Sequence, residues 1–124
     1  MPYIVHRDEL QPLKKSNAGW DRFDLVGPIN ARIMGATYEL GVLSPGFSTT
    51  LHYHVDGENY IYIIHGAGKL VVEGEAFPVE ADYSIDIEKG EKHLIRNDGE
   101  GPLEFLEFLI PENTKTVILN EDGS

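Results

Sequence analysis

Short apolar segments alternate along the whole chain with turn-forming Gly, Pro, Asn and Asp residues. Regular short runs bounded by such residues predict an all-β sandwich or barrel, and no window shows a sustained helical period. The expected strands cover residues 38–43, 47–54, 59–65, 69–72, 83–87, 93–97, 103–110 and 115–119.

Two of these segments carry more specific expectations. A β-hairpin is predicted over residues 69–79 with its turn at Gly74, and Pro78 places the second strand of this hairpin at a sheet edge or a bulge. Residues 103–110 are apolar on both faces, which favours burial on both sides and contact between subunits. We therefore expect a homodimer.

Composition narrows the class of protein. The chain has 124 residues, 41% of them hydrophobic, which suits one domain with its own core. Its formal net charge of −11 would repel phosphate backbones, so nucleic acid is not an expected partner. No basic cluster or long apolar stretch occurs, so we expect no membrane contact and a cytoplasmic location. With no Cys, a bound metal would depend on His and carboxylate ligands.

Two histidines, His52 and His54, lie two positions apart within one expected strand. Side chains alternate between the faces of a strand, so both imidazoles are expected on one face, where they can reach a common metal ion. Taken alone, this pair is a weak signal, because two ordinary surface or core histidines give the same pattern.

The pair belongs to a longer series of spaced residues. Gly46, His52, His54, Glu58 and Gly66 follow one another with five, one, three and seven residues between them. Further along the chain, a second series with two and three intervening residues contains Gly90, His93 and Asn97.

Together the two series resemble the two motifs of the cupin superfamily, G-x5-H-x-H-x(3,4)-E-x6-G and G-x5-P-x-G-x2-H-x3-N. The resemblance covers about residues 40–110. It departs from the second motif at Asp82 and Glu88, which stand where that motif has Gly and Pro. The resemblance implies a cupin-type antiparallel β-barrel (a jelly roll) formed by a single domain, 1–124, with an N-terminal arm at 1–30.

The resemblance also implies a metal site. One divalent transition metal ion (Fe, Mn, Zn, Ni, Co or Cu) would be bound by His52, His54, Glu58 and His93. In some cupin lyases, a Tyr two residues beyond the carboxylate acts as a base, so Tyr60 is the candidate catalytic residue.

The fourth ligand has two candidates. Glu58 has the three-residue spacing from His54, whereas the six-residue spacing before Gly66 selects Asn59. Adjacent strand residues face opposite ways, so a regular strand cannot point both at the metal. Glu58 is favoured because a carboxylate offsets metal charge, and Tyr60 would then face inward as well. If Asn59 faces inward, Ile61 and Ile63 do so instead.

The resemblance implies an enzyme that acts on a small oxygen-rich molecule such as an organic acid or an enolate. Cupins with these ligands include dioxygenases, decarboxylases, isomerases and lyases, and the motifs do not choose among them. The alternative is a non-catalytic cupin that binds a sugar or an organic acid, and a metal-free interaction protein is a third reading. Trp20 is expected to anchor the N-terminal arm, with substrate stacking as its alternative role, and Arg32 is a candidate for binding an anion.

Overall fold

The computed structural model describes residues 4–13, 18–25, 35–111, 113–120 and 122–124. Within these residues, the chain forms one short 3₁₀-helix and ten strands, and no helix there has the length and hydropathy needed to cross a membrane. The elements are η1 (Arg7–Glu9), β1 (Trp20–Asp24), β2 (Glu39–Leu43), β3 (His52–His54), β4 (Glu58–His65), β5 (Ala67–Val72), β6 (Glu75–Glu80), β7 (Ser84–Ile87), β8 (His93–Arg96), β9 (Leu103–Ile110) and β10 (Thr116–Ile118).

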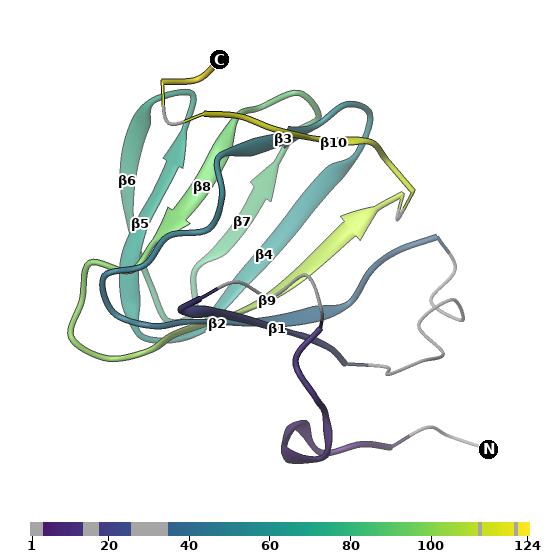
Figure 1. Ribbon diagram of the computed structural model, residues 1–124, viewed down its shortest axis with the longest axis vertical. Helices are drawn as coiled ribbons and strands as arrows, with labels where there is room; N and C mark the ends of the chain where they lie inside the picture. The colour runs from purple at the N-terminus through teal and green to yellow at the C-terminus, as the bar shows by residue number, and fades with distance from the viewer. Residues whose placement is uncertain (1–3, 14–17, 26–34, 112, 121) are drawn as a thin grey trace.

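The strands form two five-stranded sheets that face each other, as Figure 1 shows. The first sheet has the order β1-β2-β9-β4-β7 and the second has the order β10-β3-β8-β5-β6. Neighbouring strands in both sheets pair antiparallel. The predicted all-β antiparallel architecture is therefore confirmed.

Several strand predictions match closely. The segment 103–110 is β9, and the predicted hairpin is the β5–β6 pair, which turns at Glu73 and Gly74 with φ values of 49° and 79°. Positive φ at both turn residues gives the backbone twist that two-residue hairpins favour. Pro78 lies in β6, an edge strand of the second sheet, as its missing N–H requires.

Two segments differ from their predictions. Within the expected N-terminal arm, Trp20–Asp24 forms β1 and pairs with β2 along its whole length. This strand was missed because three of its five residues are charged. The predicted strand 47–54 is regular only at His52–His54, and an isolated bridge joins Ser48 to Arg96.

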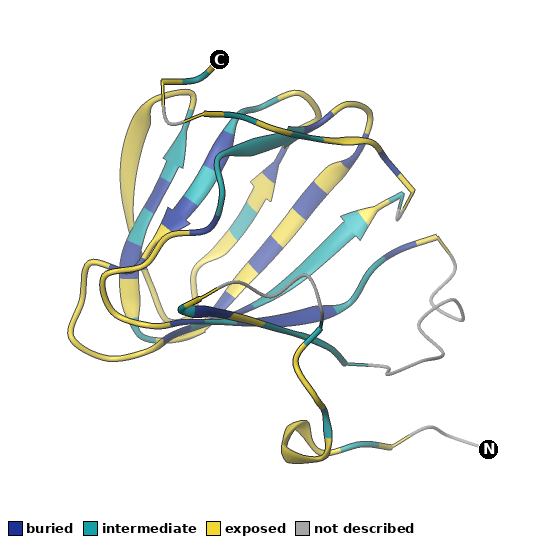
Figure 2. Cartoon of the chain, in the orientation of Figure 1, coloured by how far each residue is buried: buried dark blue, intermediate teal, exposed yellow. Residues whose placement is uncertain are grey.

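The hydrophobic core lies between the two sheets. Along β4, buried and exposed residues alternate strictly through Ile63, and Figure 2 shows this as alternating dark and light bands. The inward residues Ile61 and Ile63 pack with Leu103 and Phe105 of the adjacent strand β9. Fully burying a side chain of this size contributes about 1.5–3 kcal/mol, so this alternation fixes which face of β4 points inward.

A close approach between β2 and β9 shapes the space beside this core. A Cβ atom at Gly41 would lie 2.5 Å from the ring of Phe105, which a real side chain could not do. Gly41 therefore lets Phe105 lie across β2, and this ring forms part of the wall of the cavity described next.

Candidate metal centre

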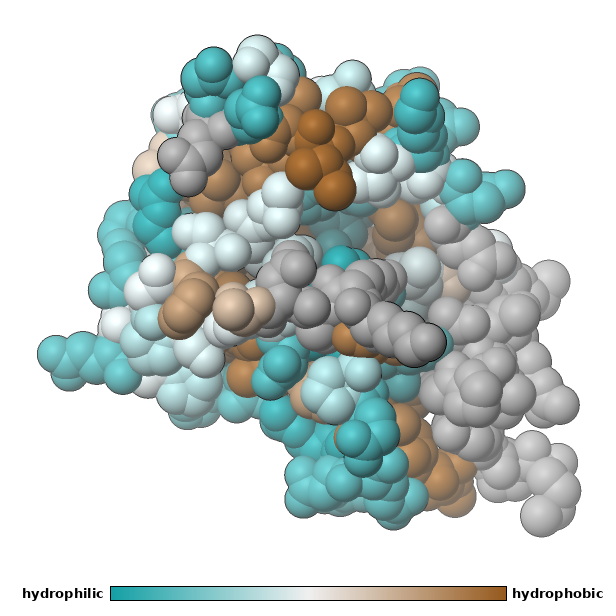
Figure 3. All heavy atoms as spheres, in the orientation of Figure 1, coloured by the Kyte–Doolittle hydropathy of each residue, from teal (hydrophilic) through white to brown (hydrophobic). Residues whose placement is uncertain are grey.

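A cavity of about 460 Å³ lies between the two sheets. Ile118 lines it while remaining 70% exposed, so this residue belongs to the rim of the cavity. On the face seen in Figure 3, hydrophobic side chains gather over the β3 and β10 end of the molecule. The charged and imidazole side chains of the lining are His52, His54 and His93 from the second sheet and Arg22, Glu39 and Glu107 from the first.

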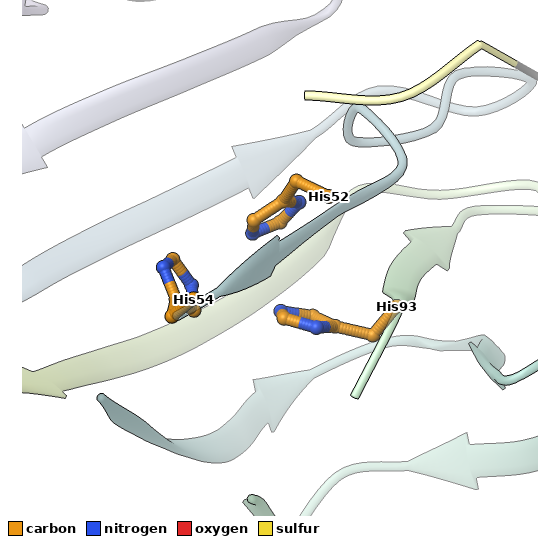
Figure 4. A group of neighbouring side chains, drawn as sticks. All are labelled: His52, His54 and His93. Carbon is orange, nitrogen blue, oxygen red and sulfur yellow. The ribbon is translucent and has the colours of Figure 1, made fainter. Parts of the chain in front are cut away.

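The three histidines form one cluster, drawn in Figure 4. His52 and His54 come from β3, and His93 of β8 is the direct cross-strand partner of His52. The ring centroids lie 4.2 Å apart for His52 and His93, 4.9 Å for His52 and His54, and 5.5 Å for His54 and His93. One potential ligand nitrogen from each ring lies within 4.8 Å of the others. The predicted convergence of these residues is therefore present.

Backbone carbonyl groups fix the proton on two of the rings. The Nδ1 of His52 lies 2.6 Å from the carbonyl oxygen of Thr50, and the Nδ1 of His93 lies 2.8 Å from that of Glu91. A carbonyl oxygen only accepts hydrogen bonds, so Nδ1–H must donate in both cases. The lone pair of a neutral ring is then on Nε2. In metal-binding histidines generally, a hydrogen bond from the other ring nitrogen orients the imidazole in this way.

The remaining ring has a hydroxyl partner, since the Nδ1 of His54 lies 2.9 Å from the Oγ1 of Thr116 in β10. The Nε2 atoms of His54 and His93 are buried and have no hydrogen-bond partner among the described residues. A buried nitrogen without a partner is costly unless something binds it, and a metal ion would do so.

The electrostatics of the cluster keep the rings of His54 and His93 neutral. The pKa of His93 is lowered to about 3 and that of His54 to about 4, in both cases first by burial and second by the nearby His52. The neutral imidazole is the form that binds a metal. Three imidazoles, two of which have buried Nε2 atoms without a partner among the described residues, fit a transition metal ion such as zinc, copper, iron or nickel.

The structure places Glu58 and Tyr60 outside the cavity, which corrects their expected inward orientation. Glu58 is exposed, Tyr60 is 40% exposed, and the Tyr60 hydroxyl donates a hydrogen bond to the Glu58 Oε2 at 2.5 Å. This hydrogen bond is the main cause that raises the pKa of Tyr60. The register between β4 and β9 is regular from Glu58 to Ile63, so no bulge turns Glu58 inward.

Asn59 faces the cavity instead, which is the alternative that the spacing to Gly66 selects. The residue is fully buried, and its Nδ2 donates to the carbonyl oxygen of Phe108 at 3.0 Å. Its Oδ1 has no hydrogen-bond partner among the described residues. As expected for this orientation, Ile61 lines the same cavity, and Ile63 lies in the core.

Sequence reasoning missed the charged residues on the opposite wall. Arg22 donates from Nε and Nη2 to one oxygen of Glu39 at 3.2 and 3.1 Å, and its guanidinium lies 4.6 Å from the centroid of the Trp20 ring. Arg32, the basic residue singled out from the sequence, lies outside the described residues.

Glu107 is the third charged residue of this wall. Burial raises the pKa of its carboxyl group, and the adjacent Glu39 adds to the rise while Arg22 opposes it. A signal for this residue was present in the sequence, because Glu107 continues the inward series of Leu103 and Phe105 on β9. A carboxylate in an otherwise apolar inward series indicates a functional position.

Comparison with known proteins identifies the family. A cupin domain model matches residues 39–109, more than half of the chain, so this protein belongs to the cupin family. The jelly-roll prediction made from the two motifs is thereby confirmed.

Individual relatives support the same assignment. The chain is 37% identical over 112 residues to an oxalate-binding protein of Thermotoga maritima, covering 86% of this chain and 93% of the relative. It is 28% identical over 110 residues to the polyketide synthase protein CurC of Streptomyces cyaneus, covering 89% of this chain and 70% of the relative. A crystal structure of a predicted oxalate decarboxylase from Thermotoga maritima superposes with a TM-score of 0.77 and 30% identity, covering 87% and 98% of the two chains.

The lowered pKa values predict how the metal-free protein responds to acid. Between the ordinary His pKa of 6.5 and about 4, the unfolded chain binds protons at His54 and His93 that the folded state excludes. The free energy of unfolding should therefore fall as the pH falls through this window. Thermal denaturation of chelator-treated protein measures the effect, with His93→Gln as the comparison because it removes one of the two groups. Equal pH slopes for the variant and the parent would contradict the prediction.

Proposed function

We propose that this protein is a metal-dependent cupin enzyme that acts on a small oxygen-rich molecule. The observation that carries the proposal is the cluster of His52, His54 and His93, whose rings are oriented through Nδ1 and whose buried Nε2 atoms on His54 and His93 lack partners among the described residues. One divalent transition metal ion is the partner that this arrangement fits.

The side chains of the cavity have separate tasks in this proposal. A metal bound by the histidines would act as a Lewis acid on the oxygen atoms of the ligand or as the site of dioxygen activation. Apolar lining residues such as Ile61, Ile95 and Phe105 exclude water, which strengthens polar contacts inside the cavity. Arg22 and Glu107 offer polar groups to the part of the ligand farther from the histidines.

The relatives agree with a small oxygen-rich ligand. One is named an oxalate-binding protein, and a similar structure is described as a predicted oxalate decarboxylase. Another is named a polyketide synthase protein. Organic acids and polyketides both present oxygen atoms that can bind a metal, which is the property that the proposed site requires.

The second candidate is a non-catalytic cupin that binds a small ligand such as an organic acid or a sugar. Two observations favour it. One relative is named for binding oxalate, and Tyr60, the candidate base, lies outside the cavity with its hydroxyl engaged by Glu58.

A metal titration of matched variants tests the metal centre. His52→Ala should reduce metal occupancy severely, because it removes one of three ligands. Asn59→Ala should weaken metal binding by about tenfold or more, the scale on which groups beside the ligands matter. Glu58→Gln is the control and should bind metal like the parent, since Glu58 lies outside the cavity.

Metal content by elemental analysis and affinity by calorimetry measure these effects, and circular dichroism checks folding. Full metal content in His52→Ala would overturn the site. Loss of metal in Glu58→Gln with retention in Asn59→Ala would restore Glu58 as the fourth ligand.

A substrate screen separates the two candidate functions. We expect the metal-loaded protein to convert a carboxylate or enol-type compound, because the proposed site offers a Lewis acid in a cavity with apolar walls. Runs with and without dioxygen distinguish oxygenase chemistry from decarboxylation, isomerisation or elimination. Tight, metal-dependent binding without turnover of any bound compound would favour the non-catalytic alternative.

The homodimer stays part of the proposal. On the outer side of the first sheet, Tyr38 stacks on Phe108 at 4.8 Å, and Tyr60, Tyr62 and Ile110 are each at least 40% exposed. Burial of this aromatic surface against a second copy would remove apolar area from water. Analytical ultracentrifugation at micromolar concentration should give twice the 13.9 kDa chain mass, and a monomer alone would contradict the proposal.

A further inference from the structure

The cavity wall opposite the histidines has an unusual distribution of charge. Glu39 of β2 and Glu107 of β9 are direct cross-strand partners, so two carboxyl groups lie side by side. Arg22 donates two hydrogen bonds to Glu39, at 3.1 and 3.2 Å from the same carboxylate oxygen. Like charges placed directly opposite destabilise a strand pair, and a hydrogen bond from the Asn59 side chain is among the contacts that favour the charged form of Glu107.

This charge distribution restricts what a ligand can present to the wall. A ligand carboxylate would become the third carboxyl group around one guanidinium, which costs free energy through repulsion or through uptake of a proton. A hydroxyl group both donates and accepts a hydrogen bond, so it can pair with Glu107 in either protonation state of the carboxyl group.

The rest of the lining suits a partly apolar ligand of ring size. Trp20 is 6% exposed and lines the cavity, and its indole N–H has no acceptor among the described residues. Ile61, Phe105 and Leu109 add apolar surface around it. The volume of about 460 Å³ lies in the range of pockets that hold ring-sized molecules, and oxalate would fill only a small part of it.

We propose that the cavity selects a ring-sized hydroxylated molecule, which presents metal-binding oxygens to the histidines and a hydroxyl group to Glu107, over a dicarboxylate. Glu107 is then a specificity-determining residue of the site. This inference rests on the proposed metal centre and deepens it by naming the class of ligand.

Three related probes test the inference by calorimetry on zinc-loaded protein. Salicylate chelates through its carboxylate and phenol oxygens, and gentisate adds a hydroxyl group para to the phenol oxygen. The third probe carries a carboxylate at that same position. We expect gentisate to bind about tenfold more tightly than the carboxylate analogue, with salicylate between them. In Glu107→Gln this ratio should shrink several-fold, whereas Glu58→Gln, on the outer face, should keep the ratio of the parent.

Zinc content is measured first on each variant, so failure of the metal centre is separated from failure of the inference. Zinc bound in all variants, with the carboxylate analogue equal to or tighter than gentisate, would overturn the ligand class. An unchanged ratio in Glu107→Gln would overturn the role of that residue. If none of the three probes binds the zinc-loaded protein, the ligand class is also wrong, while the metal centre stands.

Discussion

The pairing of β3 with β8 is the contact on which the rest of the site depends. In the strand ladder this pairing consists of one residue pair, His52 opposite His93, so the register of a single pair brings histidines from two distant segments together. Thr49 supports this register, because its N–H donates to the carbonyl oxygen of Ile95 at 2.8 Å and its Oγ1 accepts from the N–H of Ile95 at 2.9 Å. A shift of one residue would turn both histidines of β3 away from the cavity.

Much of the site could be predicted from residue spacing, because the three histidines are fixed by strand alternation and by the two motifs. The expectation that Glu58 faces inward rested on the chemistry of a single ligand, and the structure places Glu58 outside the cavity. An inward Glu58 would have exposed Ile61 and Ile63, and burying each contributes about 1.5–3 kcal/mol. The free energy gained by burying Ile61 and Ile63 therefore outweighed the preference of a metal for a carboxylate. The positions of these two residues in the sequence already indicated which face of β4 points inward.

The opposite wall was harder to predict, for a different reason. Arg22 belongs to β1, and the charged residues of this strand make it hard to recognise as a strand from the sequence. Its partner Glu39 is the first residue of β2 and lies 17 residues further along the chain. Only tertiary pairing brings the two together across β1 and β2. Local periodicity predicts which side chains of a strand point inward, but it does not predict which other strand carries the oppositely charged partner of a residue.

The short edge strand β10 both contacts a histidine of the cluster and contributes to the rim of the cavity. Thr116 holds the ring of His54, and Ile118, two residues further along the same strand, forms part of the rim through which the cavity meets solvent. The entry of a molecule past this rim and the orientation of the His54 imidazole therefore both depend on the position of the three-residue strand β10. A bulky ligand that displaced β10 would also disturb the orientation of the His54 ring, whereas a ligand that fitted beneath β10 would leave that orientation intact.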